Sequence, residues 1–475
     1  MNQSKKIVKN TLFLLFGQIV TIASSFLIIV SIARYLGEVG LGKYSFAFAL
    51  ASLLLTNSDL GICTFLLRDV ARNKKNARKY LSNIFTLNLF ILLITASAIM
   101  IFVFFSIKSV EMVIIVWLAT LGIFLNSLTT PFRMIWNAFE KMEYYSLIMV
   151  VERTLALLLV SIALIKGFGL SVLMLAFVAS YAASFVLALI ITTKRFTKFN
   201  LEIKVQLWLS LIRESIPFWL TALFMMFYFK IDTIILSAIK GYVEVGLYNA
   251  AYKLVEPLSF VPFIVIGAIF PAMSRFHIKS KEILVKLYEK SIYYLFLIAF
   301  PVGLGVTFLA DRIIFFIYKS QFISSSFPLK VLIWAEVILF INYIMGYLLN
   351  SINKQRLFTY SVIISALLNL VLNLMLIPIY GYVGASVVAV FTQVINFSLL
   401  YYFCSKNGYS INFLKTITKP ILAGIIMVVL MFSLKSFHIF LIVPAAVITY
   451  FAVLLITKGI GNEELDLVKN FLKGD

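Results

Sequence analysis

The sequence predicts an all-α multi-pass membrane protein with about fourteen transmembrane helices. Apolar residue types make up 62% of the 475 residues and charged types 13%, whereas an average soluble protein is roughly half apolar and a quarter charged. The mean hydropathy is +1.03, and apolar runs of about 20 residues, long enough to cross a bilayer, recur from end to end. A soluble enzyme, a disordered chain and a secreted disulfide scaffold are therefore excluded.

The expected spans are continuous apolar runs without a period of two. This pattern favours helices over a closed barrel, since a chain in lipid must satisfy its own backbone hydrogen bonds in one of these two ways. The expected spans are residues 11–33, 44–67, 83–105, 110–130, 146–165, 170–193, 215–238, 247–272, 291–310, 329–350, 358–379, 382–404, 419–434 and 438–457.

Lysine and arginine residues predict the orientation. With the N-terminus inside, 29 of the 41 Lys and Arg residues lie in inner segments and nine lie in outer segments. This bias over short loops is the positive-inside pattern, and it places both termini in the cytoplasm, with the protein in the cell membrane. The net charge of +21 then reflects topology and attraction to anionic membrane lipid, so no nucleic acid partner is expected.

A short repeat indicates a duplication. The tetrapeptide Glu-Val-Gly-Leu occurs at residues 38–41, between spans 1 and 2, and again at residues 244–247, between spans 7 and 8. Six spans per copy is an even number, so both copies share one orientation, as in parallel-repeat transporters. We therefore expect two six-helix lobes in parallel repeat plus two extra helices.

The duplication sets the expected domain boundaries. They are an N-terminal lobe at 1–193, an interlobe linker at 194–214, a C-terminal lobe at 215–404, and two accessory spans with a cytoplasmic tail at 405–475. From Val205 the apolar residues of the linker fall near helical spacing. This predicts an amphipathic helix on the inner surface, with a plain solvated linker as the alternative.

Charged residues inside spans are costly and usually face a cavity or a partner. Lys253 and Glu256 lie three residues apart on one helix face, where their side chains can meet. Either they form a structural ion pair, or Glu256 releases the Lys253 cation when substrate binds. Lys230 is the second candidate for binding an anion. The acids Asp59, Asp232, Glu256 and Glu336 are candidates for coupling to a proton or sodium ion, while Asp232 alternatively pairs with a neighbouring span.

Other residues within or near the spans carry further expectations. Glu152 and Arg153, near the inner end of span 5, are expected to reach toward the headgroups. The amides of Asn369 and Asn373 share one helix face, where they either hold helices together or face sugar hydroxyls in a polar cavity. Three prolines on span 8 predict a kinked helix; they are Pro257, Pro262 and Pro271.

No motif for a cofactor or a metal is present. The chain has no HExxH, P-loop or dinucleotide-binding pattern, and Cys63 and Cys404 stand alone. Its two histidines are His277, in an expected inner loop, and His438, at a span end. We therefore expect a protein that is not an enzyme and holds no metal or cofactor, although a proton or sodium gradient could drive it.

Four stretches carry a family resemblance: residues 32–44, 231–236, 245–254 and 373–385. They resemble the polysaccharide-transport flippases of the multidrug/oligosaccharidyl-lipid/polysaccharide exporter superfamily. The resemblance implies cation-coupled alternating access that flips an isoprenoid-linked oligosaccharide for cell-surface polysaccharide synthesis. It also implies lobe-facing cations for the (pyro)phosphate, with Lys230 and Lys253 as the positions here, and polysaccharide polymerase or assembly proteins as partners.

Three other functions remain open at this point. A cation-coupled exporter of small drugs would belong to the same superfamily. A membrane enzyme acting on lipid-linked sugars needs acceptor-binding loops and catalytic groups at the surface, which the short outer loops do not favour. A non-transporting member of a polysaccharide-assembly complex would share the same hydropathy pattern.

Overall fold

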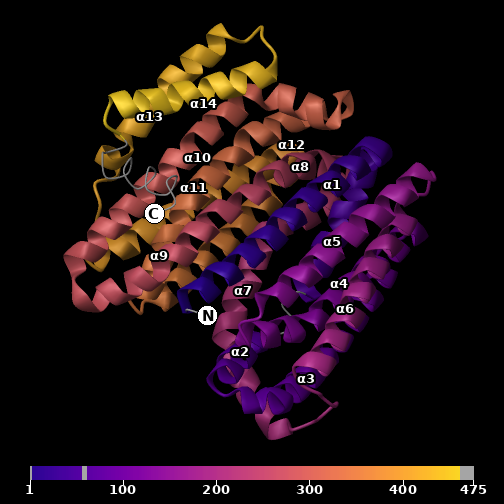
Figure 1. Ribbon diagram of the computed structural model, residues 1–475. Coiled ribbons are helices and arrows are strands. Elements are labelled where there is room, and N and C mark those ends of the chain that lie inside the picture. The colour runs from indigo at the N-terminus through magenta and orange to yellow at the C-terminus, as the bar shows by residue number, and fades with distance from the viewer. Residues whose placement is uncertain (1–2, 56–60, 460–475) are drawn as a thin grey trace. The chain divides into compact units, whose positions relative to one another are not determined.

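The computed structural model describes residues 3–55 and 61–459. All regular elements in this part of the chain are helices (Figure 1), which confirms the all-α fold class. Their bounds are α1 Gln3–Leu55, α2 Ile62–Arg72, η1 Lys74–Asn76, α3 Ala77–Ser106, α4 Val110–Ala138, α5 Met142–Ile165, α6 Leu170–Arg195, α7 Val205–Lys240, α8 Tyr242–Val255, η2 Glu256–Ser259, α9 Phe260–Lys279, α10 Lys281–Tyr318, η3 Ser320–Ser325, α11 Ser326–Ser351, α12 Gln355–Lys406, α13 Phe413–Ser433 and α14 Ile439–Ile456.

The number of spans agrees with the expectation. Eleven helices in the described residues are long and apolar enough to cross a membrane, and residues 417–433 form a shorter apolar helix. Two of the eleven, α1 and α12, each contain two expected spans joined at a glycine with positive φ, Gly37 at 68° and Gly381 at 56°. Glycine adopts this backbone conformation without the steric cost of a Cβ atom.

The chain divides into two compact units, residues 1–250 and 251–475. The boundary falls within α8, so that α7 and most of α8 group with the first six spans. This division reflects the contacts between helices. It does not test the lobe boundaries expected at 1–193 and 215–404, which stay a prediction. Each unit is described separately below.

In the first unit, α1 packs on α4 and α5, while α6 packs on α4 and α5. Figure 1 shows α4, α5 and α6 running side by side. Aromatic rings fill the contact between α1 and α6, where the Phe177 ring centroid lies 5.7 Å from that of Tyr44 and 5.2 Å from that of Phe48. The helices of this unit therefore enclose a common interior.

The segment between α6 and α7 differs in part from the expected linker. A helix does begin at Val205, but it continues without a break to Lys240 as α7. Before it, the chain is held along α3, because the backbone N–H of Asn200 donates to Ser82 Oγ and that of Glu202 donates to Thr86 Oγ1, at 3.2 and 3.1 Å. The amphipathic turns are thus continuous with the helix that contains the candidate span Ala222–Lys240.

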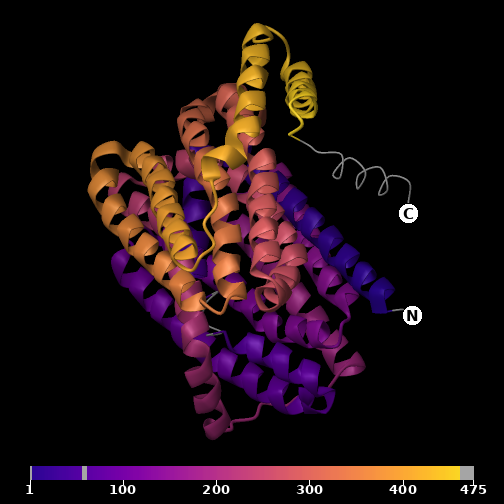
Figure 2. The ribbon, with the colours of Figure 1, turned by 90° about the vertical axis from the view of Figure 1, so that its left-hand side faces the viewer.

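In the second unit, the main core lies between α9, α10, α11 and α12. A smaller core joins α10 to α13 and α14, with Leu297, Met427 and Tyr450 among its buried members. Both views show α13 and α14 as a pair (Figures 1 and 2). The two accessory helices are therefore anchored to this unit by their own apolar contacts.

Span 8 is interrupted, as its prolines predict. The α-helix stops at Val255, a 3₁₀ turn covers Glu256–Ser259, and α9 begins at Phe260. Pro257 lies in this turn, and its missing N–H removes one hydrogen bond of a continuous α-helix. The interruption places Glu256 at the end of one helix and the start of the turn.

Candidate functional site

Lys253 and Glu256 form an ion pair at the interruption of span 8. Lys253 Nζ lies 2.5 Å from Glu256 Oε2, and their side chains are 22% and 36% exposed. The expected contact across one helix turn is therefore present. Transfer of Lys253 from Glu256 to a substrate anion stays a prediction.

Lys230 and Asp232 lie on α7 in the first unit. Lys230 is half-buried, while Asp232 is only 4% exposed. The Tyr248 hydroxyl on α8 donates to Asp232 Oδ2 at 2.6 Å, so a neighbouring span does supply a partner. Asp232 Oδ1 is buried and has no hydrogen-bond partner among the described residues. A carboxylate oxygen left in this way suits a proton or a metal cation.

Glu336 is the second buried acid. It lies on α11 in the second unit at 8% exposure, and its Oε2 has no hydrogen-bond partner within residues 3–55 and 61–459. Its role in coupling, like that of Asp232 and Glu256, stays a prediction. Asp59, the remaining candidate, lies outside the described residues.

The amides of α12 have the geometry of helix packing. Asn369 and Asn373 are 1% and 0% exposed. Asn373 Nδ2 donates to Asn369 Oδ1 at 3.0 Å, and Asn369 Nδ2 donates to Thr392 Oγ1 on the other half of α12 at 3.4 Å. These bonds join the two halves of α12, so in this structure the amides face each other rather than a polar cavity. Contact with sugar stays a prediction.

The structure differs from what the sequence predicts at residues 131–138 and at Glu152. Residues 131–145 were expected to be an inner loop, but α4 continues to Ala138 and contains Arg133. Glu152 was expected to reach the headgroups, but its side chain is 6% exposed and pairs with Arg133, whose Nη2 lies 2.5 Å from Glu152 Oε2. A buried carboxylate without a counter-charge is costly, and Arg133 supplies the cation that keeps Glu152 compensated inside the unit.

Arg133, Glu152 and Arg153 form a cluster that we call the arginine–glutamate cluster. Asn126 Nδ2 donates to Glu152 Oε1 at 3.3 Å, and Arg153 Nε lies 3.6 Å from the same oxygen. The Arg153 guanidinium lies 5.9 Å from the ring centroid of Tyr181 on α6. Helices α4, α5 and α6 together thus place two cations around one carboxylate inside the first unit.

A sequence signal for the missed helical turns does exist. Phe132, Ile135 and Trp136 are completely buried, and their spacing of three and four residues continues the apolar face of α4 past Pro131. The expected span stops at residue 130, which places Arg133 in a loop. No pattern in the sequence, however, shows that Arg133 meets Glu152.

Each of the two histidines contacts a neighbouring group of the protein. His277 Nδ1 lies 3.3 Å from the hydroxyl of Tyr409, in the loop after α12, and burial raises the pKa of that tyrosine above its usual value. The His438 ring accepts from the backbone N–H of Phe440 at the start of α14, at 3.5 Å. Across the described ranges, no three His, Cys, Asp or Glu side chains are grouped so that they could hold a metal ion.

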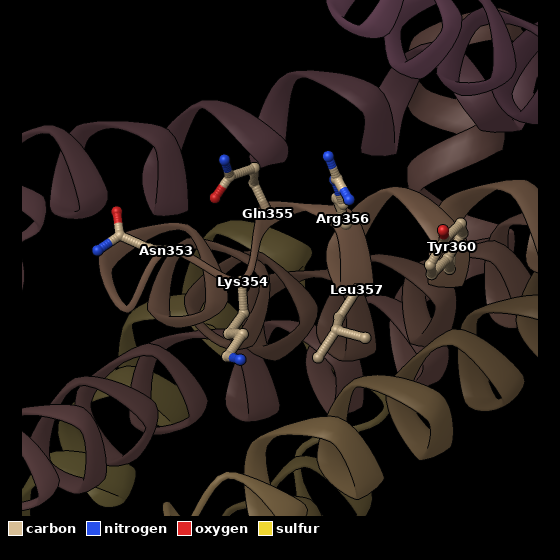
Figure 3. Close-up of a pocket in the computed structure, with 6 residues that line it drawn as sticks. All are labelled: Asn353, Lys354, Gln355, Arg356, Leu357 and Tyr360. Atoms are coloured by element: carbon tan, nitrogen blue, oxygen red, sulfur yellow. The ribbon is translucent and has the colours of Figure 1, made fainter.

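A pocket of about 510 Å³ lies beside the turn between α11 and α12. Figure 3 shows the side chains of Gln355 and Arg356 on one side of the chain and those of Lys354 and Leu357 on the other. Asn353 and Tyr360 complete the lining. The two cations of this pocket suit anionic groups, but none of the residues predicted to bind substrate or coupling ion lines it.

A family model described as polysaccharide biosynthesis protein matches residues 7–277. This chain belongs to that family. A second model, MatE, matches residues 217–375. The protein is therefore a member of the multidrug/oligosaccharidyl-lipid/polysaccharide exporter superfamily, in its polysaccharide branch, which confirms the resemblance found in the sequence. It is a multi-pass membrane transporter or flippase.

Two curated proteins are similar to this family member. A probable low-salt glycan biosynthesis flippase of Haloferax volcanii, Agl15, is 27% identical over 206 residues, which cover 42% of this chain and 44% of that protein. An uncharacterized membrane protein of Methanocaldococcus jannaschii is 29% identical over 178 residues, 37% of this chain and 35% of that protein. The chain thus matches less than half the length of either relative.

Solved structures show the same fold. A Lipid II flippase MurJ in an inward closed conformation has a TM-score of 0.78 at 15% identity, covering 96% of this family member and 99% of that chain. A MATE transporter of Vibrio cholerae has a TM-score of 0.56 at 14% identity, covering 85% and 98%. At these identities the likeness concerns the fold alone. The named relatives of known type are flippases and transporters rather than enzymes.

Proposed function

We propose that this protein flips an isoprenoid-linked oligosaccharide across the cytoplasmic membrane for the synthesis of a surface glycan. The observation that carries the proposal is the match of residues 7–277 to the polysaccharide biosynthesis family. The partial likeness to a protein described as a glycan biosynthesis flippase supports the same substrate class. The head of such a lipid is too polar to cross hydrocarbon unaided, whereas its isoprenoid tail can stay in lipid.

In this proposal Lys253 and Lys230 hold the phosphate groups of the substrate. Lys253 is the better placed to change partners, because its ion pair with Glu256 is partly exposed and lies at a break in span 8. A phosphate that approaches Lys253 competes with the Glu256 carboxylate. Glu256 would then exchange Lys253 for a proton or a sodium ion, which links substrate binding to the coupling cation.

Coupling to a cation gradient is the second part of the proposal. Asp232 and Glu336 each keep one buried oxygen without a hydrogen-bond donor in the described residues. An isolated carboxylate inside a membrane span is most stable when it holds a proton or a metal cation. Release of that cation on the other side of the membrane would drive the return step. Both termini would face the cytoplasm in this arrangement, as the Lys and Arg distribution indicates.

The test is a flipping assay with the purified protein in liposomes. A fluorescent isoprenyl diphosphate oligosaccharide is placed in both leaflets, and a reducing agent that does not cross the membrane reports the share exposed outside over time. We expect protein-dependent flipping that rises with an imposed proton or sodium gradient and does not require ATP. Liposomes with protein that flip no faster than empty liposomes, under every gradient, would refute the proposal.

Export of small cationic molecules is the second candidate function. The MatE model matches residues 217–375, and MATE transporters share the fold. Inverted membrane vesicles that hold the protein and accumulate a cationic dye under an ion gradient would favour this function. The same vesicles with the Asp232→Asn variant serve as the control for coupled transport.

A further inference from the structure

The arginine–glutamate cluster of the first unit carries more positive than negative charge. It contains two guanidinium groups and one carboxylate, all on helices α4 and α5. Both helices are long and apolar enough to cross a membrane, and a charge without a counter-charge is costly at such a position. The cluster therefore favours the approach of an anion.

Arg133 and Asn126 already satisfy the carboxylate. Arg133 Nη2 occupies Glu152 Oε2 at 2.5 Å, and Asn126 Nδ2 donates to Oε1 at 3.3 Å. Asn126 Oδ1 in turn accepts from Arg133 Nη1 at 3.5 Å. These three side chains form a hydrogen-bonded set. Arg153 adds a longer contact, from Nε to Glu152 Oε1 at 3.6 Å, so one carboxylate is shared between two guanidinium groups and the cluster keeps one net positive charge.

The accessible part of the cluster is the cationic part. The Arg153 side chain is 25% exposed and that of Arg133 is 14% exposed, while that of Glu152 is only 6% exposed. A ligand that enters this region meets guanidinium before carboxylate. In addition, Nε of each arginine is buried without a hydrogen-bond partner in the part of the chain that the structure describes.

Tyr181 holds Arg153 in place without neutralising it. The Tyr181 side chain is 2% exposed, and the guanidinium lies 5.9 Å from the centroid of its ring. A cation over an aromatic face is attracted to the ring but keeps its charge and its N–H donors. A guanidinium fixed in this way can bind two oxygens of one phosphate group at once, which a lysine cannot do with the same geometry.

We propose that the arginine–glutamate cluster is a phosphate-binding subsite, in which Arg153 binds the diphosphate of the lipid-linked substrate and Glu152 keeps Arg133 beside it. The inference rests on the proposed flippase function and adds a binding element to it. Neither Arg133 nor Arg153 is among the residues predicted from the sequence to contact substrate. The subsite lies wholly within the first unit.

The test measures ligand-induced thermal stabilisation of the full-length protein in detergent. The probes are farnesyl diphosphate, farnesol and inorganic pyrophosphate, each titrated while Tm is recorded, because a ligand at free concentration L that binds only the folded state stabilises it by RT ln(1 + L/Kd) and so raises Tm as its concentration exceeds Kd. We expect farnesyl diphosphate to raise Tm more than either other probe. The Kd from the titration should rise at least tenfold in Arg153→Gln. It should change less than threefold in Arg72→Gln, which alters an exposed arginine at the end of α2.

Two further variants keep the test decisive if Arg153→Gln does not fold. Arg153→Lys keeps the charge but loses the fork of donors, so its Kd should lie between those of the wild type and the glutamine variant. Glu152→Gln removes the internal counter-charge but keeps a side-chain oxygen that can accept from Arg133, so farnesyl diphosphate should bind at least threefold more tightly. A purely structural cluster predicts neither change.

The outcomes separate the subsite from the flippase function. A wild-type protein that farnesyl diphosphate does not stabilise would contradict the proposed substrate class itself. Stabilisation that is equal in wild type, Arg153→Gln and Arg153→Lys would overturn the subsite and leave the flippase function standing. If farnesyl diphosphate and free pyrophosphate raise Tm equally, the proposal that the subsite binds a lipid-linked diphosphate would be overturned.

Discussion

Gly42 on α1 packs against the carbonyl oxygen of Tyr242 so closely that a Cβ atom at Gly42 would lie 1.8 Å from that oxygen. The relationship is reciprocal, because a Cβ atom at Gly246 would lie 2.0 Å from the carbonyl oxygen of Glu38. Glu38 and Gly246 belong to the two copies of the repeated tetrapeptide. The repeat found in the sequence thus marks two hairpins whose backbones meet in the first unit.

Gly42→Ala should destabilise the protein. The added methyl group would overlap the carbonyl oxygen of Tyr242 unless one of the helices moves. Overpacking of this kind costs about 1–3 kcal/mol. Gly305→Ala is the matched control, since its Cβ atom would have no neighbour within 4 Å and alanine is the better helix former by about 1 kcal/mol. Thermal unfolding in detergent should show a lower Tm for the first variant and an unchanged or higher Tm for the second.

Tyr248→Phe should also lower Tm. The variant removes the donor that satisfies Asp232 Oδ2 at 2.6 Å, and a buried acceptor left without a donor costs about 1–3 kcal/mol. Asp232→Asn keeps an acceptor for the tyrosine, so this variant should fold, while its flipping should lose any dependence on the ion gradient. An Asp232→Asn protein whose flipping still follows the gradient would remove Asp232 from the coupling scheme.

The ion pair of Lys253 and Glu256 allows a test that separates structure from function. Lys253→Met should abolish delivery of surface glycan while the protein still accumulates. The double variant Lys253→Met with Glu256→Gln removes both charges of the ion pair together, so neither is left without the other. If Lys253 binds substrate, the double variant stays inactive. Restored delivery in the double variant would reduce the pair to a structural contact.

The orientation can be measured with single cysteines in a protein that lacks Cys63 and Cys404, both of which are buried. Exposed positions are Lys166 and Tyr380 for the outside and Lys75 and Lys279 for the inside. The neighbouring Gly381 is avoided because its positive φ of 56° disfavours any other residue. A thiol reagent that cannot cross the membrane should label the first two in intact cells, and the other two only after permeabilisation. The opposite pattern would invert the topology.

Much of the fold follows from local properties of the chain. The length and continuity of apolar runs predict spans, because hydrogen bonds of a helix in lipid are satisfied within each segment. The prolines predict the break at Glu256–Ser259 for the same local reason. The ends of spans are less certain. The span expected at 110–130 stops before the last turns of α4, which contain Arg133.

The sequence by itself determined the class, the number of spans, the family and the residues whose charge is costly in a membrane, since each depends on composition, periodicity or a short motif. Only the tertiary structure decided which partner each charged group has. Tyr248 reaches Asp232 from the next span, whereas Arg133 and Glu152 are 19 residues apart and meet between α4 and α5. Such contacts depend on how helices rotate and slide against each other. Packing of whole helix faces sets that geometry, and no single residue's spacing encodes it.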